Sequence, residues 1–371
     1  MKLLIEKNIL LESLTNVMRA ISPKNIIPIL NGVMFDLRED GLYLTASDSD
    51  LTIRNFIPKE KIKNIAIPGK IVIQSKYLLE IIRKLPNGDI NIEVIDGLKI
   101  IISTDKTIYN LNCLDTADYP DINLEEVENP IVINSTTLKQ AFNKTLFAVS
   151  TQESRPILTG INLKINGNVM ECVATDSYRL AKKTITLDNA YDSRDIVIPG
   201  KNINELDKLI TDESDVEIHV FNNKIVFKYM NYIFQSSLLS GSYPNTNNLI
   251  PTKFEFVITT SLNDYYNAID RAALLTQNKD KNIIKMETNN TELLISSYAS
   301  EIGKSEESIL INKSTEQDIS ISFSSKYMID ALKTFEDEEL IIFLNNDSSP
   351  IILKSAKDET LIQLILPIKT Y

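Results

Sequence analysis

The chain has 371 residues, 43% of them apolar, which is enough for two or three domains with buried cores. No apolar run approaches the ~18 residues of a membrane-spanning helix, and the N-terminal MKLLIEKN does not resemble a secretory signal, so we expect a cytoplasmic protein. The net charge of −11 argues against a nucleic-acid-binding surface spread over the whole protein.

Few residues of the kinds that most enzymes use are present. His219 is the only histidine, and Cys113 and Cys172 are the only cysteines, which excludes a His-rich metal site and most catalytic triads. The ten glycines form neither a dinucleotide-binding loop nor a P-loop. We therefore expect no metal and no cofactor. In VEIHVF, His219 alternates with apolar residues, which predicts that it faces solvent.

Short segments recur at spacings near 125 residues. The matching pairs are IPIL at 27–30 with RPIL at 155–158, ASDS at 46–49 with ATDS at 174–177, and SKYLLE at 75–80 with SKYMID at 325–330. This period is too long for a solenoid repeat, so each copy is predicted to be a domain. Three copies fill the chain, and we expect domains at 1–122, 130–246 and 253–371.

Each copy shows the same order of elements. A first strand (2–6, 131–134, 254–259) precedes a helix (9–24, 135–150, 260–277), for which Asn8, Ser135 and Thr260 are the expected N-caps. Alternating strands follow, then a second helix (75–85, 201–210, 325–335) and three more strands. The pattern predicts an α+β fold with two helices on antiparallel sheets in each domain.

Basic residues gather in the predicted helices. These carry twelve bases and seven acids, so they sum to +5 and leave −16 for the rest. In helix 135–150 the stripe of Leu138, Ala141, Phe142, Leu146 and Val149 directs Lys139, Asn143 and Lys144 away from the core. In helix 75–85, Lys76, Arg83 and Lys84 lie opposite Leu78, Ile82 and Leu85. Solvated lysine faces are common on amphipathic helices, so charge alone leaves DNA binding open.

Several segments together resemble one family. The threefold repeat, IPILNGVMFDL, LTASDSDLTIR, ATDSYRLAKK and the terminal LILPIKTY are similar to the bacterial sliding clamp, the beta subunit of DNA polymerase III. The resemblance covers essentially the whole chain. It implies that each chain forms half of a closed ring, and that two chains close head to tail around duplex DNA as a homodimer. Such a clamp is a non-catalytic processivity factor.

The resemblance also implies three sets of site residues. Contacts to duplex DNA, without sequence preference, are expected from Lys24, Lys76, Arg83, Lys84, Lys139, Lys144, Gln152, Lys201 and Lys208. A pocket for the linear motif of the polymerase III alpha subunit, the clamp loader and other partners is expected from Leu158, Thr175, Tyr178, Arg179, Leu180, Pro251, Ser349, Leu366, Pro367 and Ile368. The family often has Gly-His where this chain has Ser177-Tyr178.

For the dimer interface, we expect the edge strand 106–112 to meet the third domain of the partner copy. The residues involved are Lys106, Tyr109, Leu111, Leu274, Leu275, Glu301, Glu306 and Glu307. Apolar contacts would supply most of the affinity and the charges the orientation.

Two other classes of function compete with a clamp. Asp48-x-Asp50 has the form of a metal-binding D-x-D in an enzyme, but its repeat equivalent is Asp176-x-Tyr178, which favours a structural role. A three-domain acidic scaffold that does not bind DNA is the other alternative. Retention on circular but not linear DNA would distinguish the clamp from the scaffold.

Overall fold

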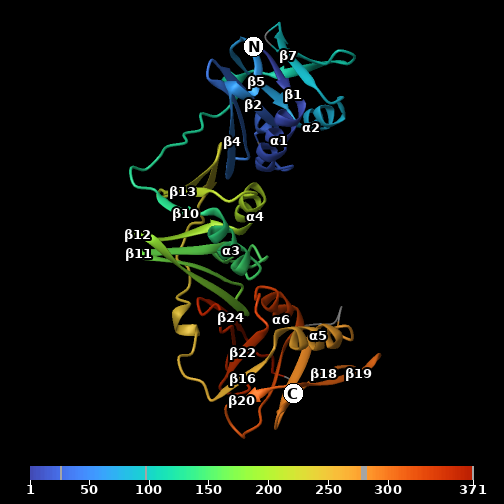
Figure 1. The fold of residues 1–371 in the computed structure, drawn as a ribbon, viewed down its shortest axis with the longest axis vertical. Helices are drawn as coiled ribbons and strands as arrows, with labels where there is room; N and C mark the ends of the chain where they lie inside the picture. Colours follow the sequence, from blue (N-terminus) through green and yellow to red (C-terminus); the bar gives the residue numbers. More distant parts are fainter. Residues whose placement is uncertain (26, 97, 277–281, 370–371) are drawn as a thin grey trace. The chain divides into compact units, whose positions relative to one another are not determined.

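The computed structural model describes all residues except 26, 97, 277–281 and 370–371. Its contacts divide the chain into two compact units, each made of two separate segments (Figure 1). The first unit contains Met1–Leu138 and Lys201–Leu238, and the second contains Lys139–Gly200 and Leu239–Tyr371.

The first unit is built on one 13-stranded antiparallel sheet, in the order β10-β13-β14-β15-β4-β3-β2-β6-β9-β8-β7-β1-β5. Its strands are β1 (Lys2–Glu6), β2 (Gly32–Arg38), β3 (Gly41–Ser47), β4 (Leu51–Pro58), β5 (Ile62–Ile67), β6 (Gly69–Gln74), β7 (Asp89–Ile95), β8 (Lys99–Ser103), β9 (Ile108–Leu114), β10 (Ile131–Asn134), β13 (Asp215–Val220), β14 (Lys224–Tyr229) and β15 (Tyr232–Ser237). Its helices include α1 (Lys7–Val17), α2 (Ser75–Lys84) and nearly all of α4 (Gly200–Leu209), with 3₁₀ turns η1 (Met18–Ala20), η2 (Pro28–Asn31), η3 (Lys59–Lys61) and η4 (Thr116–Asp118).

The second unit contains a seven-stranded sheet, β11-β12-β24-β23-β22-β16-β20, and a four-stranded sheet, β19-β18-β17-β21. The strands are β11 (Gly160–Thr175), β12 (Arg179–Pro199), β16 (Phe256–Ser261), β17 (Ile283–Asn289), β18 (Glu292–Ala299), β19 (Gly303–Leu310), β20 (Asn312–Lys313), β21 (Ser320–Ser324), β22 (Glu339–Leu344), β23 (Ile351–Lys354) and β24 (Leu361–Ile365). Its helices are α5 (Leu262–Ala273) and α6 (Ser325–Leu332), with η5 (Pro156–Thr159) and η6 (Asn247–Leu249). Helix α3 (Ser135–Leu146) begins in the first unit and ends in the second.

Strand pairing joins consecutive repeats within each unit. In the first unit β15 pairs antiparallel with β4, with Tyr232 opposite Asn55. In the second unit β12 pairs with β24 in the same way, with Leu180 opposite Leu364. Pairing of this kind satisfies the backbone groups that an edge strand would leave exposed.

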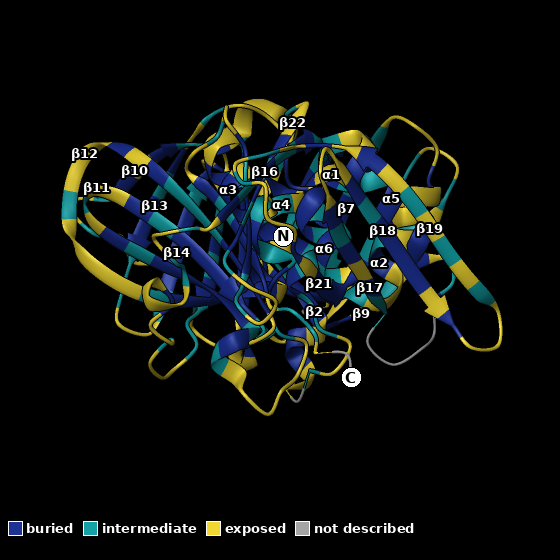
Figure 2. Cartoon of the chain, turned by 90° about the horizontal axis from the view of Figure 1, so that it is seen from below, coloured by how far each residue is buried: buried dark blue, intermediate teal, exposed yellow. Residues whose placement is uncertain are grey.

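The helices pack apolar faces against the sheets as their sequences predict. Leu78 and Ile82 of α2 are buried, while Lys76, Arg83 and Lys84 are exposed on its other side. In Figure 2 the strands are mainly buried, whereas exposed positions gather in the connecting loops. None of the helices in the described part of the chain has the length and hydropathy that a membrane span requires.

Helix boundaries and caps differ from the sequence prediction. Helix α1 ends at Val17 and is followed by η1, so Lys24 lies in a turn beyond both elements. The predicted caps Asn8, Ser135 and Thr260 are wrong. Helix α1 starts at Lys7 after Glu6, and Asn134 and Ser261 accept the backbone N–H bonds at the starts of α3 and α5. Short polar side chains compete locally for this position, so cap prediction slips by a residue or two.

The six observed helices also carry less charge than expected. With the shorter boundaries they contain ten bases and seven acids, a sum of +3, because Arg19, Lys24 and Lys333 fall outside them and Lys7 enters. The segregation of charge is therefore weaker than the sequence indicated.

The prediction that His219 faces solvent is wrong. Its side chain is 1% exposed, and its Nδ1 accepts a hydrogen bond of 3.0 Å from the backbone N–H of Val127. The segment before β10 therefore covers the face of β13 that alternation had assigned to water. Alternation identifies the two faces of a strand but not what covers each of them.

Candidate partner-binding pocket and DNA-facing residues

The turn between β11 and β12 places Tyr178 and Arg179 at the start of a strand. Asp176 Oδ1 accepts hydrogen bonds from the backbone N–H groups of Tyr178 (2.9 Å) and Arg179 (3.0 Å), and Ser177 has a φ of 78°. The first repeat has the same turn, in which Asp48 Oδ1 accepts from Asp50 and Leu51 and Ser49 also has a φ of 78°.

These two turns explain the repeated aspartate. Each carboxylate closes a tight turn by local bonds to the backbone, as Asp does in Asx turns. The structural interpretation of Asp48 and Asp176 is therefore confirmed. The described residues contain no cluster of three or more His, Cys, Asp or Glu side chains with the geometry of a metal site.

Arg179 is held by charge and by aromatic rings. Its Nε lies 3.0 Å from Asp176, and its Nη1 lies 2.7 Å from Asp330 on α6. The guanidinium also lies over the rings of Phe147 and Tyr327, at 5.1 and 4.6 Å from their centroids. The side chain is only 9% exposed. Its two carboxylate partners and two rings fix the guanidinium in one orientation.

Exposed Tyr178 and half-buried Tyr327 cover this arrangement. Their rings are stacked with centroids 6.3 Å apart, and Tyr178 is largely exposed. The backbone carbonyl of Tyr178 accepts from the N–H of Leu366 at 2.9 Å, and the N–H of Ile368 donates to Ser322 at 2.7 Å. These two bonds anchor the C-terminal segment beside the tyrosine pair.

A small apolar cluster lies next to this segment. Val173, Leu180, Ile352 and Leu364 are buried together, and partly buried residues pack against them, namely Tyr243, Ile250, Phe254, Phe343 and Ile362. The hydroxyl of Tyr243 accepts a hydrogen bond from the N–H of Thr175, whose own hydroxyl donates to Arg179 O. Apolar and aromatic surface with a few fixed polar groups is typical of a ligand-binding site.

The structure thus brings together six of the ten predicted pocket residues at the β11–β12 turn, on β12 and in the segment that follows β24: Thr175, Tyr178, Arg179, Leu180, Leu366 and Ile368. Pro367, half-buried, lies between the last two. The remaining three come from other segments of the same unit. Leu158 is buried in η5, Pro251 follows η6, and Ser349 lies between β22 and β23.

Sequence reasoning missed Tyr327 and Asp330, which hold Arg179. One signal was available in the sequence. SKYMID at 325–330 repeats SKYLLE at 75–80, so Tyr327 is the equivalent of Tyr77, which is exposed. An aromatic residue that recurs at the same helix position in two repeats indicates a contact surface.

The residues predicted to contact DNA differ in their exposure and in whether a carboxylate of the same chain pairs with them. Lys24, Lys76, Lys84 and Gln152 are exposed, and the described residues offer no carboxylate in ion-pair distance of the three lysines. Arg83 pairs with Glu80, Lys201 with Asp50 at 3.1 Å, and Lys208 with Glu205 at 2.6 Å. Lys139 is half-buried.

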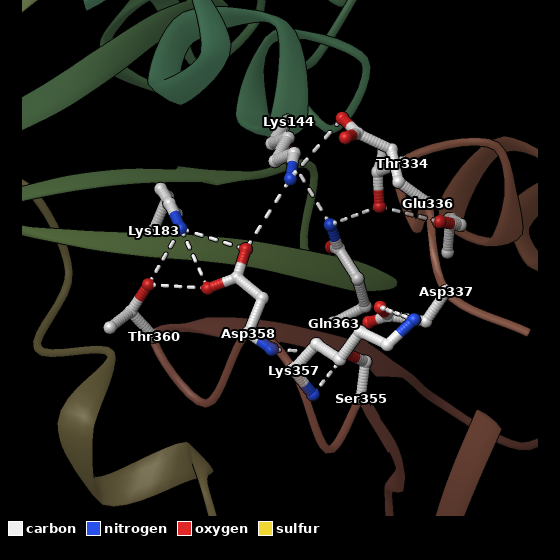
Figure 3. A network of polar contacts seen from close by, with 11 residues as sticks. Lys144, Lys183, Thr334, Glu336, Asp337, Ser355, Lys357, Asp358, Thr360 and Gln363 are labelled. Carbon is white, nitrogen blue, oxygen red and sulfur yellow. Dashed lines mark hydrogen bonds and ion pairs between the residues drawn. The ribbon is translucent and has the colours of Figure 1, made fainter. Parts of the chain in front are cut away.

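Lys144 departs most from the sequence expectation that it points away from the protein. Its side chain is only 12% exposed, and its Nζ lies 3.3 Å from Asp358 and 3.5 Å from Glu336 (Figure 3). Lys183 reaches the same Asp358 carboxylate at 2.7 Å. Burial alone would raise the pKa of Asp358, but the hydrogen bonds and charges of Lys183, Thr360 and Lys144 lower that pKa to about 2.

Strands β9 and β19 carry four of the residues predicted for the dimer interface, namely Tyr109, Leu111, Glu306 and Glu307. Strand β9 begins at Ile108, so Lys106 precedes it, and β9 pairs with β8 along its length but with β6 only at Cys113 and Leu114. Strand β19 is one of the two outer strands of its four-stranded sheet. Glu306 and Glu307 on β19 pair with Lys304 and with Arg271, the latter at 2.9 Å.

Comparison with known proteins identifies the family. Models of the N-terminal, central and C-terminal domains of the DNA polymerase III beta subunit match residues 1–124, 132–245 and 247–369. This chain belongs to the DNA polymerase III beta subunit family. The beta sliding clamps of Bacillus subtilis and Staphylococcus aureus are 41% and 37% identical to it, each over the whole of both chains.

Solved structures of sliding clamps agree with this assignment. The crystal structure of the DNA polymerase sliding clamp from Bacillus subtilis matches with a TM-score of 0.96 and 40% identity, over all of both chains. The DNA polymerase III beta chain of Streptococcus pneumoniae matches with a TM-score of 0.96 and 34% identity, also over all of both chains. The predicted fold class, three clamp domains of helices and antiparallel sheets, is confirmed.

Proposed function

We propose that two copies of this chain close head to tail into a ring around duplex DNA and tether DNA polymerase III to its template in the cytoplasm. The chain would be a non-catalytic subunit of that polymerase. The observation that carries this proposal is the full-length match to sliding clamps by three consecutive repeats. The proposed domains are 1–122, 130–246 and 253–371.

The dimensions of such a ring suit DNA. Twelve inward helices at ~9 Å spacing give a circumference of roughly 110 Å, or ~35 Å between opposite helix axes. Subtracting ~10 Å for the helices leaves an opening of ~25 Å. Duplex DNA is ~20 Å wide, so it would pass with a layer of water. Enclosure would retain the DNA, and weak phosphate contacts would let the ring slide.

Exposed apolar side chains on and near β9 and β19 support the proposed dimer contact. Ile108 on β9 and Leu310 on β19 are among the most exposed large apolar side chains, and Leu274 after α5 is 62% exposed. We propose that β9 of one copy, through Tyr109 and Leu111, pairs with β19 near Leu274 and Leu275 of the other. Lys106 would then approach Glu301, Glu306 and Glu307. Such head-to-tail contacts close into a ring when the rotation permits.

The exposed bases would supply the DNA contacts. Lys24, Lys76 and Lys84 have no internal carboxylate partner within the described residues. They would therefore contact phosphates without first breaking an ion pair. Arg83, Lys139, Lys201, Lys208 and Gln152 would add weaker contacts. Phosphate contacts carry no sequence information, so no base preference is expected. Lys144 would contribute little, because two internal carboxylates hold its largely buried side chain.

The surface around Tyr178 would receive the linear motif of the polymerase alpha subunit, the clamp loader and other partners. Exposed Tyr178 and Leu366 flank the apolar cluster, and the fixed Arg179 lies beneath them. Leu158, Thr175, Leu180, Pro251, Ser349, Pro367 and Ile368 complete the proposed pocket. A short peptide that buries a few side chains here would bind with micromolar affinity, about 7–8 kcal/mol.

Retention on DNA tests the ring directly. The full chain, loaded onto a nicked circular plasmid, should remain bound in high salt and be lost when the plasmid is linearised, because only topology holds it. A variant with Lys24, Lys76 and Lys84 changed to Ser should lose salt-sensitive affinity but keep retention on the circle. Equal retention on circular and linear DNA would overturn the ring and favour an acidic scaffold.

A further inference from the structure

The first compact unit contains a cavity that belongs to none of the sites described above. Its volume is about 130 Å³, and it lies where the first and second repeats join. Helix α1, the end of β4, the end of α4 and the β14–β15 turn line it. Cavities near this size hold a benzene-sized ring. The space is therefore large enough for a small organic molecule.

One wall of the cavity carries a buried hydrogen-bond acceptor without a partner. Asn55 is 3% exposed, and its Oδ1 has no hydrogen-bond partner within the described residues. Its Nδ2 is directed to the carbonyl of Asn231, at 3.4 Å. A buried carbonyl oxygen without a donor destabilises the fold, and each such atom calls for an explanation. A ligand N–H group would satisfy it.

A donor lies beside that acceptor. Tyr232 is directly opposite Asn55 in the β4–β15 ladder, so both side chains stand on the same face of the sheet. The Tyr232 hydroxyl accepts a hydrogen bond of 2.9 Å from Asn16 Nδ2, which leaves its own proton to donate. Burial raises the pKa of Tyr232, so the hydroxyl keeps that proton at neutral pH.

The equivalent place in the second unit shows why this space is open. At an offset of 128 residues, Lys144 and Lys183 stand where the first unit has Asn16 and Asn55. There, both lysines hold Asp358, and Gln363 Nε2 donates to Lys144 O and to Thr334 (Figure 3).

The connection that supplies Asp358 differs in length between the two units. It spans residues 355–360 between β23 and β24, whereas β14 and β15 are joined by Met230 and Asn231 alone. The shorter turn brings no carboxylate, and neutral asparagines replace the lysines. A cavity without these ion pairs therefore occupies the position that the network fills in the second unit.

We propose that the cavity binds a small neutral ligand in which a flat ring carries a carboxamide or lactam. The ligand N–H would donate to Asn55 Oδ1, and its carbonyl would accept from the Tyr232 hydroxyl. The ring would pack against Ile9, Phe56 and Met230, which also line the space. Glu12, Asp212 and Lys61 bring both signs of charge to the lining, which favours an uncharged ligand. This proposal does not depend on the proposed ring function.

Benzamide tests the proposal, with methyl benzoate as a matched compound that keeps the ring and carbonyl but lacks the N–H. Titration of the full chain, followed by the NMR signal of the Met230 methyl group, should show saturable millimolar binding of benzamide. Benzamide should bind about five- to tenfold more tightly than methyl benzoate, the worth of one hydrogen bond. A crystal soaked with benzamide should show it between Asn55 and Tyr232.

Three variants assign the contacts. Asn55→Leu should remove the preference for benzamide, and Tyr232→Phe should weaken both compounds, whereas Tyr77→Phe, on an exposed tyrosine of the same unit, should change neither. If Asn55→Leu does not fold, Tyr232→Phe and the pair of compounds still decide the question. Absence of saturable binding, or equal affinity for the two compounds in the parent chain, would overturn the proposal and leave water as the occupant.

Discussion

Burial of His219 makes the first compact unit sensitive to acid. Burial first, and then the nearby charge of Lys228, lowers the pKa of this imidazole below its ordinary value of about 6.5, despite the opposing effect of Glu217. The folded state therefore binds fewer protons than the unfolded state as the pH falls through that range. Stability from the neutral His219 is present above pH ~6.5 and is lost progressively below it.

The expected outcome is a free energy of unfolding that falls between pH 7 and pH 5. Chemical denaturation across this range measures it, and the assignment is simple because His219 is the only histidine of the chain. The variant His219→Gln, which keeps an acceptor for the Val127 N–H, should show a flatter profile. The same slope in parent and variant would contradict this account.

Arg179 gives a second prediction at the scale of one residue. Arg179→Ala removes the partner of Asp176 and Asp330 and the contacts to Phe147 and Tyr327, so we expect a loss of about 1–3 kcal/mol in the free energy of unfolding. Peptide binding should weaken because Tyr327 loses its support. Urea unfolding and peptide titration measure the two effects.

The control is Arg194→Ala, because Arg194 and its partner Asp192 are both largely exposed and 3.8 Å apart. This change should cost less than about 0.5 kcal/mol. An equal loss of stability in the two variants would show that the internal contacts of Arg179 do not stabilise the fold.

At the scale of elements, the network in Figure 3 ties α3 and β12 to the segment before β24. Asp358→Asn removes the charge shared by Lys144 and Lys183, and should lower the stability of the second unit by about 1–3 kcal/mol. Because its pKa is lowered to about 2, the contribution of Asp358 is present above pH ~4 and is lost as the pH falls toward 2.

Hydrogen exchange of the β12–β24 ladder measures this effect. Faster exchange is expected in Asp358→Asn at neutral pH, and the difference from the parent should shrink in acid. Asp192→Asn is the matched control, since Asp192 is exposed and lies 3.8 Å from Arg194. Unchanged exchange in Asp358→Asn would show that the β-ladder, rather than the charges, holds these elements together.

The elements themselves were largely predictable from sequence. Period and alternation identified six helices and the strand-rich order of each repeat, because these depend on which face a residue presents. What the sequence could not predict depends on neighbours distant in the chain. The cover over His219 comes from residues near Val127, and the support of Arg179 comes from Asp330. Lys144 appeared solvent-facing because Asp358 is 214 residues away.

At the scale of the whole molecule, the proposed dimer gives the sharpest test. Leu274→Glu with Leu275→Glu should give a folded monomer, because two carboxylates would be buried without partners in an apolar contact. Mass measured in solution, with circular dichroism to check folding, gives the answer. Leu249→Glu, on another exposed leucine, should leave the dimer intact. A dimer that survives the double change would place the interface elsewhere.

The chain passes between the two compact units three times, after Leu138, Gly200 and Leu238. This path determines the order in which the units can fold during synthesis. Each compact unit is made of two separated segments, so neither is complete when its first segment leaves the ribosome. The first unit has all its residues once Leu238 has been made, whereas the second waits for the C-terminal β24 while its own first segment, Lys139–Gly200, is already exposed. The edge of β12 in the long β11–β12 hairpin must therefore stay unpaired until β24 has been made. During this interval the nascent chain is most open to pairing with the wrong strand.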